Sequence, residues 1–195
     1  MDRVRYWLAL VEVTLVPGAL LYWFSIHPFV RFWRGVGARV TVALHILMIF
    51  VVGCGIYLLR GRLLAVEFGT NPLLIGFAVP VLLASLVLKR ALARHLKVRI
   101  LIGMPELAGE LSTQRMLCEG IYARIRHPRY VEVFLALIFF ALFTNYLASY
   151  VILAASAPAL FAIIHIEERE LRDRFGEEYV RYCARVPRFW PYFKL

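Results

Sequence analysis

Charged side chains are scarce in this sequence. They make up 18% of its 195 residues, whereas a typical soluble domain carries about 25%. Apolar residues reach 62%, and the mean hydropathy is +0.71. This composition excludes an ordinary soluble domain, a disordered tail and a collagen-like fibre. It predicts an all-α, polytopic membrane protein.

Cysteine is also scarce, with three residues, and these follow no known motif. Cys54, Cys118 and Cys183 are far apart, with no CxxC pair and no histidine at ligand spacing. The pattern supports neither a disulfide framework nor a zinc site, so we expect no metal.

The sequence also lacks repeats, low-complexity runs and a polar linker. We therefore expect a single integral membrane domain over 1–195, with three spans in 1–90 and the remaining polar mass in 91–195. The apolar stretch that follows Arg5 is too long for a signal peptide and has no cleavage site, so the first span should be retained.

Five apolar runs are long enough, or nearly so, to cross about 30 Å of hydrocarbon as helices. The predicted spans are Tyr6–Ile26, Val40–Leu59, Pro72–Leu88, Pro128–Asn145 and Ala148–His165. The last two are separated by so short a connection that they form a tight antiparallel hairpin. Pro17, Pro80 and Pro158 lie inside spans, where kinks are tolerated if neighbouring groups satisfy the freed carbonyls.

Positive charge is distributed unevenly among the segments that flank these spans. The net charge is +10, and 19 of the 23 Lys and Arg residues belong to one side when the spans alternate, if Arg129 at the start of the fourth span is counted with that side. By the positive-inside rule, the amino terminus is outside and the carboxyl terminus is in the cytosol. The charges are spread over three segments without aromatic interleaving, which argues against nucleic acid as a partner. Arginine outnumbers lysine 20 to 3, which favours a bacterial inner membrane.

The hairpin brings two polar clusters together. Its two runs have 18 residues each, so the chain returns to the level at which it began. This places Arg126–Tyr130 beside Ile166–Arg169 at the cytosolic boundary. Such a cluster is costly unless its charges pair or meet a ligand. It is either a binding site or a girdle of ion pairs that anchors the helix ends.

A second helical pattern follows the last span. Its apolar positions recur at intervals of three and four residues: Leu171, Phe175, Tyr179, Tyr182 and Val186. This stripe predicts an amphipathic cytosolic helix that folds back over the membrane surface and ends before Pro187. It would serve as an interfacial anchor, as a lid over the hairpin site, or as both.

Two motifs in this region carry a family resemblance. Gly120–Tyr130 reads GIYARIRHPRY, and 167–182 follows the pattern E-E-x-x-L-x-x-x-F-G-x-x-Y-x-x-Y. A V-P-R-F-W-P segment follows at 186–191. In order and separation they resemble the isoprenylcysteine carboxyl methyltransferase and phospholipid methyltransferase superfamily. The resemblance covers roughly 117–191, whereas the first three spans are similar only in being apolar.

The resemblance implies an integral membrane methyltransferase that uses S-adenosylmethionine, with 91–195 as its cofactor-binding core. Its acceptor would be a lipid or a lipid-like small molecule. The cofactor-binding residues that it implies are Gly120, Tyr122, His127, Pro128, Tyr130, Glu167 and Glu168. The catalytic candidates are Arg126, Glu132, Glu168 and Arg188.

The acceptor stays open between a carboxylate, an amine and a thiol. A carboxylate is already ionised, and Arg126 or Arg188 would position it. An amine needs a base, and Glu132 is one candidate, although the family usually has a small residue there. The alternative for Glu132 is an interfacial ion pair with Arg129 or Arg126.

Two polar residues lie in the amino-terminal spans. Glu12 and His45 would either form interhelical hydrogen bonds, which we favour, or line an acceptor channel. Cys54 is expected to pack as a small apolar side chain.

Two other classes of function remain compatible with the sequence. One is a nicotinamide-dependent membrane reductase of the sterol-reductase type, which has a similar carboxy-terminal hairpin. The other is a non-enzymatic scaffold or transporter. A transporter typically carries polar residues at the midplane of several helices, which are few in this sequence.

Overall fold

The structure is a computed structural model that describes residues 1–94 and 116–190, except for the side chain of Arg31. Within these residues the regular structure is helical, which confirms the all-α prediction. The elements are α1 (Asp2–Ile26), α2 (Val30–Val36), α3 (Ala38–Leu58), α4 (Arg60–Leu63), α5 (Pro72–Ala93), the 3-10 helix η2 (Gly120–Ala123), α8 (Pro128–Thr144), α9 (Leu147–Phe175) and α10 (Glu177–Arg185).

Each predicted span coincides with a helix. Four of the described helices are long and apolar enough to cross a membrane, namely α1, α3, α5 and α9. The remaining predicted span, Pro128–Asn145, corresponds to α8, whose 17 residues extend about 25 Å. The helices continue through Pro17, Pro80 and Pro158. The chain is therefore a multi-pass membrane protein.

Local sequence signals fix where several helices begin and end. The Asn71 side chain accepts hydrogen bonds from the backbone of Leu73 and Leu74 at 3.0 and 3.3 Å, and so caps α5. Pro72 and Pro128 occupy the first position of α5 and α8. The backbone amide at this position has no partner within the helix, so its absence in proline costs no hydrogen bond. Asn145 adopts a left-handed conformation (φ 55°) that ends α8 and starts the hairpin turn.

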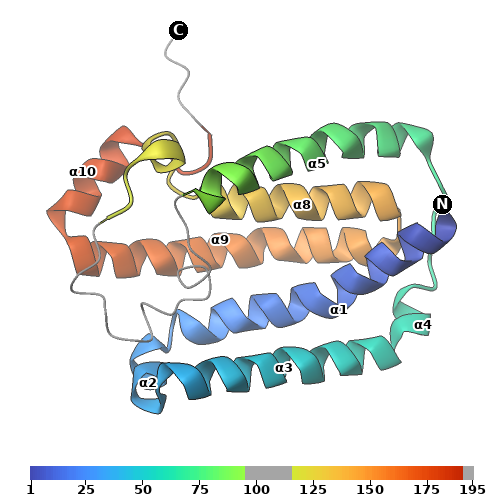
Figure 1. The fold of residues 1–195 in the computed structure, drawn as a ribbon, viewed down its shortest axis with the longest axis horizontal. Coiled ribbons are helices and arrows are strands. Elements are labelled where there is room, and N and C mark those ends of the chain that lie inside the picture. The colour runs from blue at the N-terminus through green and yellow to red at the C-terminus, as the bar shows by residue number, and fades with distance from the viewer. Residues whose placement is uncertain (95–115, 191–195) are drawn as a thin grey trace, which may run out of the picture.

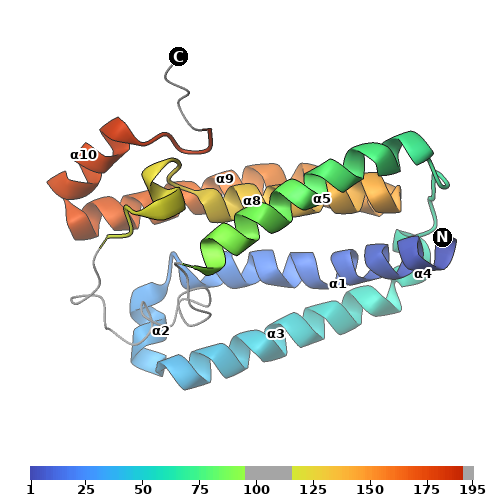
Figure 2. The ribbon, with the colours of Figure 1, turned by 45° about the horizontal axis from the view of Figure 1, so that its top comes forward.

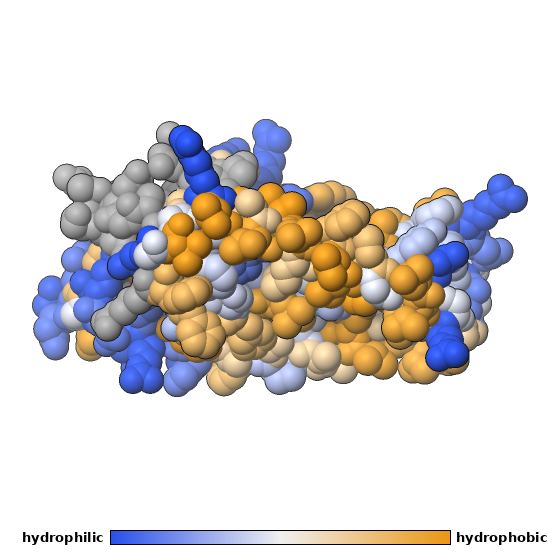
Figure 3. Space-filling model, turned by 90° about the horizontal axis from the view of Figure 1, so that it is seen from below, coloured by the Kyte–Doolittle hydropathy of each residue, from blue (hydrophilic) through white to orange (hydrophobic). Residues whose placement is uncertain are grey.

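The long helices lie lengthwise beside one another (Figure 1). α8 packs against both α5 and α9, and α1 packs against α3 on one side and the α8–α9 hairpin on the other. In both ribbon views α2, η2 and α10 gather at one end, while the amino terminus and α4 lie at the other (Figure 2). We call these the α10 end and the α4 end. Figure 3 shows a broad hydrophobic band between hydrophilic ends, as expected for a membrane protein.

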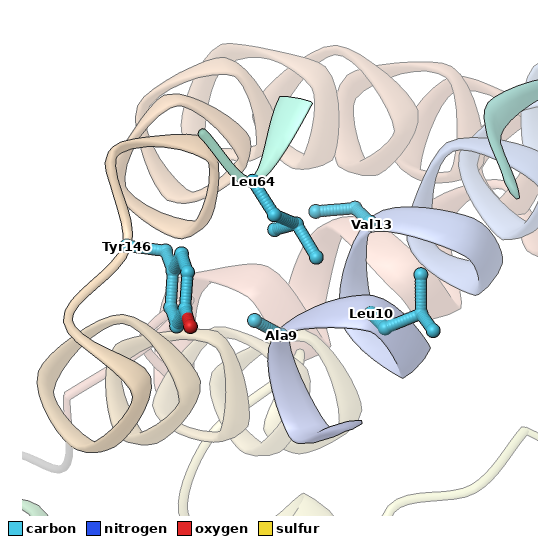
Figure 4. Close-up of a cluster of buried hydrophobic side chains, with 5 residues drawn as sticks. All are labelled: Ala9, Leu10, Val13, Leu64 and Tyr146. Atoms are coloured by element: carbon cyan, nitrogen blue, oxygen red, sulfur yellow. The ribbon is translucent and has the colours of Figure 1, made fainter. Parts of the chain in front are cut away.

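At the α4 end, a buried cluster joins α1 to the hairpin turn (Figure 4). Leu64 points toward Val13 of α1 in this view. The cluster consists of Ala9, Leu10, Val13, Leu64 and Tyr146. Two backbone hydrogen bonds, Phe68 to Asn145 (3.1 Å) and Leu147 to Val66 (3.1 Å), attach the loop after α4 to the turn.

Arg5 is the polar centre of this end. It is fully buried, and its Nε and Nη2 donate to the carbonyl of Thr144 at 2.9 and 2.8 Å. Its Nη1 lies 2.7 Å from Glu67 Oε1 and donates to Thr70 Oγ1 at 2.9 Å. Sequence reasoning counted Arg5 only as a loop charge. The structure shows that it clamps α1, the loop after α4 and the hairpin turn together.

The two polar residues of the first spans behave differently. His45 of α3 is buried, its Nδ1 lies 2.7 Å from the carbonyl of Thr41, and its Nε2 lies 3.0 Å from Ser25 Oγ of α1. The interhelical hydrogen bond favoured from the sequence is therefore present. Glu12 is also buried and interacts with Ser149 of α9, but neither of its oxygens makes a hydrogen bond of ordinary geometry.

Candidate functional site

The first motif, Gly120–Tyr130, meets the V-P-R-F-W-P segment at 186–191 through the backbone at the α10 end. The amide of Arg126 donates to the carbonyl of Pro187 at 2.8 Å, and the amide of His127 donates to that of Arg188 at 3.1 Å. These are the residues just before α8, whose amides have no helical partner. The segment after α10 therefore supplies the acceptors, as well as the Arg188 side chain.

Glu168 of α9 lies at the centre of this junction. Its Oε1 accepts hydrogen bonds from Arg126 Nη1 (2.6 Å), His127 Nε2 (3.0 Å) and Arg188 Nε (3.0 Å). Its Oε2 accepts from Arg188 Nη2 at 2.5 Å. The Glu168 side chain is only 2% exposed. One carboxylate therefore organises three side chains from two motifs, and it has little capacity left for a ligand.

The environment of Glu168 holds its pKa low. Burial acts to raise the pKa of this carboxyl, but hydrogen bonds from His127 and Arg188 and the charge of Arg126 outweigh burial and lower it to about 2. The same hydrogen bond raises the pKa of Arg188. Glu168 lies beyond the predicted span that ends at His165, and it is ionised at neutral pH.

This shift predicts how the junction responds to acid. A carboxyl whose pKa is lower in the folded state stabilises that state above its unfolded value of about 4.5, and the contribution is lost as the pH falls toward 2. The difference in unfolding free energy between the wild type and Glu168→Gln should thus stay constant from pH 7 to 5 and shrink below pH 4.5. Denaturant unfolding of both proteins in detergent at several pH values measures this difference in free energy. A difference that shrinks between pH 7 and 5 would contradict the assignment.

The amphipathic stripe packs as the sequence predicted, although the helix is broken. α9 ends at Phe175, and Gly176 takes a positive φ (53°) that favours glycine, so that α10 turns back. Tyr182 Oη donates to the carbonyl of Tyr122 at 2.7 Å and attaches α10 to η2. The stripe residues form one cluster, in which Tyr179, Tyr182 and Val186 are buried against Leu171 and Phe175.

A cavity of about 230 Å³ opens beside this junction. Its wall includes six residues that the sequence proposed for the site: Tyr122, Arg126, His127, Pro128, Tyr130 and Glu167. The aromatic rings of Phe175, Tyr179 and Tyr182 line it as well, from α9 and α10. The cavity therefore has mainly aromatic walls with a few charged groups.

Four of the proposed residues do not line the cavity. Glu168 and Arg188 pair with each other at the junction. Gly120 begins η2 with a positive φ (60°), which shapes the backbone at the start of the first motif. Glu132 belongs to α8, and its Oε1 accepts a hydrogen bond from Ser85 of α5 at 3.3 Å. The structure thus does not bring Glu132 to the cavity.

The cavity also contains residues that sequence reasoning missed. Trp23 and His27, one helical turn apart at the end of α1, line it and stack with ring centroids 5.2 Å apart. The guanidinium of Arg129 lies 4.0 Å from the centroid of the Trp23 ring, within the range of a cation–π contact. The position of a histidine and a tryptophan at the end of a span was the one indication in the sequence that Trp23 and His27 could belong to the site. Nothing in the sequence placed α1 beside the hairpin.

Glu167 presents a carboxylate oxygen that lacks a hydrogen bond. Its Oε2 is buried without a hydrogen-bond partner, and His127 Nδ1 lies 3.8 Å from it. A buried acceptor without a partner costs about 1–3 kcal/mol, so a ligand with a donor would be favoured here. Residues 1–94 and 116–190 hold no group of three or more side chains suited to a metal ion.

Residues 104–173 match the model of the isoprenylcysteine carboxyl methyltransferase (ICMT) family. The matched segment includes η2, α8 and most of α9, so it contains the first motif together with Glu167 and Glu168. It ends before α10 and Arg188. No curated protein matches the chain.

Proposed function

We propose, from the match of residues 104–173 to the ICMT family model, that the chain is a membrane methyltransferase that uses S-adenosylmethionine and methylates a lipid-like or hydrophobic small molecule. The observation that carries the proposal is the carboxylate of Glu167, whose Oε2 is buried without a hydrogen-bond partner in an aromatic cavity. This cavity is formed largely by residues of the matched segment.

The cavity fits the chemical groups of the cofactor. S-adenosylmethionine carries an ammonium and ribose hydroxyls that donate hydrogen bonds, a carboxylate that accepts them, and a flat adenine ring. Glu167 would accept from the ammonium or the hydroxyls. The guanidinium of Arg126 would face the carboxylate, and the rings of Tyr122 and Tyr130 would hold the adenine. When bound, the cofactor supplies an electrophilic methyl group on a sulfonium.

The chain itself contributes alignment and exclusion of water. Glu168 fixes Arg126 and His127 through hydrogen bonds of 2.6 and 3.0 Å, so both enter the cavity wall in set positions. α10 covers the cavity, held by the hydrogen bond from Tyr182 to Tyr122. Methyl transfer depends on in-line alignment of acceptor, methyl and leaving group, which a rigid wall of this kind supports.

The position of the cavity favours an acceptor that comes from the membrane. The α10 end borders the hydrophobic band (Figure 3), so an acceptor with an apolar tail would keep its tail in lipid and present its polar group to the cavity. We further propose that this end faces the cytosol, with the amino terminus outside, because most of the Lys and Arg residues belong to its segments. Membrane lipids are then the surrounding partner.

Binding of S-adenosylmethionine tests the proposal directly. For Glu167→Gln we expect about tenfold weaker binding or more, because the variant replaces a charge-assisted acceptor with a neutral amide. Isothermal titration calorimetry of the detergent-solubilised protein measures the change. Glu177→Gln, the same substitution at an exposed site on α10, should bind as the wild type does. A folded wild type that binds NADPH and no S-adenosylmethionine would refute the proposal and favour a reductase.

A further inference from the structure

His27 closes the cavity from the side of α1. It caps α1 directly after Ile26, and it is 8% exposed. Its ring stacks on Trp23 with an interplanar angle of 18°, which fixes the ring plane. Its Nδ1 lies 3.6 Å from Glu170 Oε2 of α9. His27 is thus held between two helices, with a carboxylate behind it and the cavity beside it.

This arrangement matches the requirements of a general base. A carboxylate near Nδ1 favours the tautomer that carries its proton there, which leaves the lone pair on Nε2. Nucleophiles are commonly activated by a neighbouring base whose ring is oriented by a further side chain, here Glu170. The separation of 3.6 Å is longer than a hydrogen bond, as is common for catalytic contacts in the absence of substrate. The other cavity histidine, His127, already engages Glu168 through its Nε2.

We propose that His27, oriented by Glu170, removes the proton of an acceptor whose nucleophilic atom carries a weakly acidic hydrogen, such as a thiol or a phenol. This inference rests on the proposed function and specifies its substrate class. A lone pair of the acceptor atom forms the new bond to the methyl carbon. The carbon–sulfur bond of S-adenosylmethionine breaks, and its electron pair stays on sulfur. The proton of the acceptor passes to His27 Nε2.

The charges around His27 favour a neutral acid over an ammonium acceptor. α8 contributes Arg129, and the segment before it contributes Arg126 and His127, while α9 contributes Glu167 and Arg174 besides Glu170. Among the residues that line the cavity, three guanidinium groups accompany one carboxylate, that of Glu167, while Glu168 behind the wall pairs with Arg126.

Arg129 in particular lies over Trp23, the ring on which His27 stacks. A positive wall lowers the pKa of a thiol or phenol, whereas it opposes entry of a cation. A carboxylate acceptor would also suit the charges, but it has no proton for His27 to take.

The test compares two acceptors of equal chain length, a long-chain alkanethiol and the corresponding fatty acid, with methyl-labelled S-adenosylmethionine in detergent. In His27→Gln, the ratio of thiol to carboxylate methylation at pH 7 should fall about 100-fold, within the usual range for loss of a general base. Thiol methylation should recover as the pH rises, because the thiol then ionises without help. Glu170→Gln should lower the same ratio about tenfold. His165→Gln, at an exposed position on α9, should leave it unchanged.

The outcomes separate this inference from the function on which it rests. If the wild type does not bind S-adenosylmethionine, both fail. If the wild type binds it and methylates only the fatty acid, or if folded His27→Gln methylates the thiol at the wild-type ratio at pH 7, this inference alone is overturned. Thermal unfolding of each variant checks the fold, and Glu170→Gln keeps the test valid should His27→Gln be unstable.

Discussion

Replacing Glu168 with alanine should destabilise the protein by about 3–5 kcal/mol, the usual cost of removing one partner from a buried ion pair. The variant leaves Arg126 and His127, with side chains 11% and 4% exposed, without their acceptor. Arg188 loses both of its hydrogen bonds to Glu168. The cavity wall should therefore lose its set geometry, and binding of S-adenosylmethionine should fall below detection.

Thermal unfolding and calorimetry on the same detergent-solubilised sample measure both effects. Glu178→Ala is the matched control, because Glu178 is exposed on α10 at the same end of the molecule. It should cost less than about 0.5 kcal/mol. Glu168→Ala with wild-type stability would show that the four close contacts at this carboxylate contribute nothing. Loss of binding at unchanged stability would instead make Glu168 a direct ligand.

Replacing Arg5 with methionine should have a comparable effect on stability, again about 3–5 kcal/mol, at the opposite end of the molecule. Methionine keeps much of the apolar length of the side chain but removes every hydrogen bond to Thr144, Thr70 and Glu67. The carbonyl of Thr144 and the carboxylate of Glu67 then lose their donors. We expect a lower unfolding temperature and faster proteolysis in the loop after α4.

Arg3→Met is the control, because Arg3 is exposed on the same helix turn. It should leave the unfolding temperature unchanged. Arg5→Met and Arg3→Met should bind S-adenosylmethionine alike under conditions in which both are folded, because the cavity lies at the α10 end. An Arg5 variant as stable as the wild type would contradict the buried clamp that the structure shows.

Much of this fold was accessible from the sequence because apolar runs of span length leave few alternatives. The equal lengths of the two hairpin runs predict that Arg126 and Glu168 lie at one level, and in the structure they are joined by a hydrogen bond of 2.6 Å. The stripe at Tyr179 and Tyr182 was predictable for a similar reason, since helical periodicity depends only on local spacing.

What the sequence did not reveal depends on how helices pack. Glu167 and Glu168 are neighbours on one helix, so they point about 100° apart. Only the placement of α9 shows that Glu168 faces the junction and Glu167 the cavity. His27 and Arg5 are likewise defined by partners on distant elements, and their positions in the first span carry no periodic signal. Glu132 shows the opposite case. Its carboxylate lies one turn from the first motif and was a candidate for the site, but it faces α5 and not the cavity.

The clamp at Arg5 has a mechanical consequence for α1. Arg5 and His27 are 22 positions apart in the sequence, which in a helix corresponds to about 33 Å. If α1 tilts by about 5° around its fixed end at Arg5, His27 and Trp23 move by about 3 Å, because a helix rises 1.5 Å per residue. The end of α1 that carries Trp23 and His27 is therefore where a small rotation changes the width of the cavity mouth most, while the α4 end stays closed.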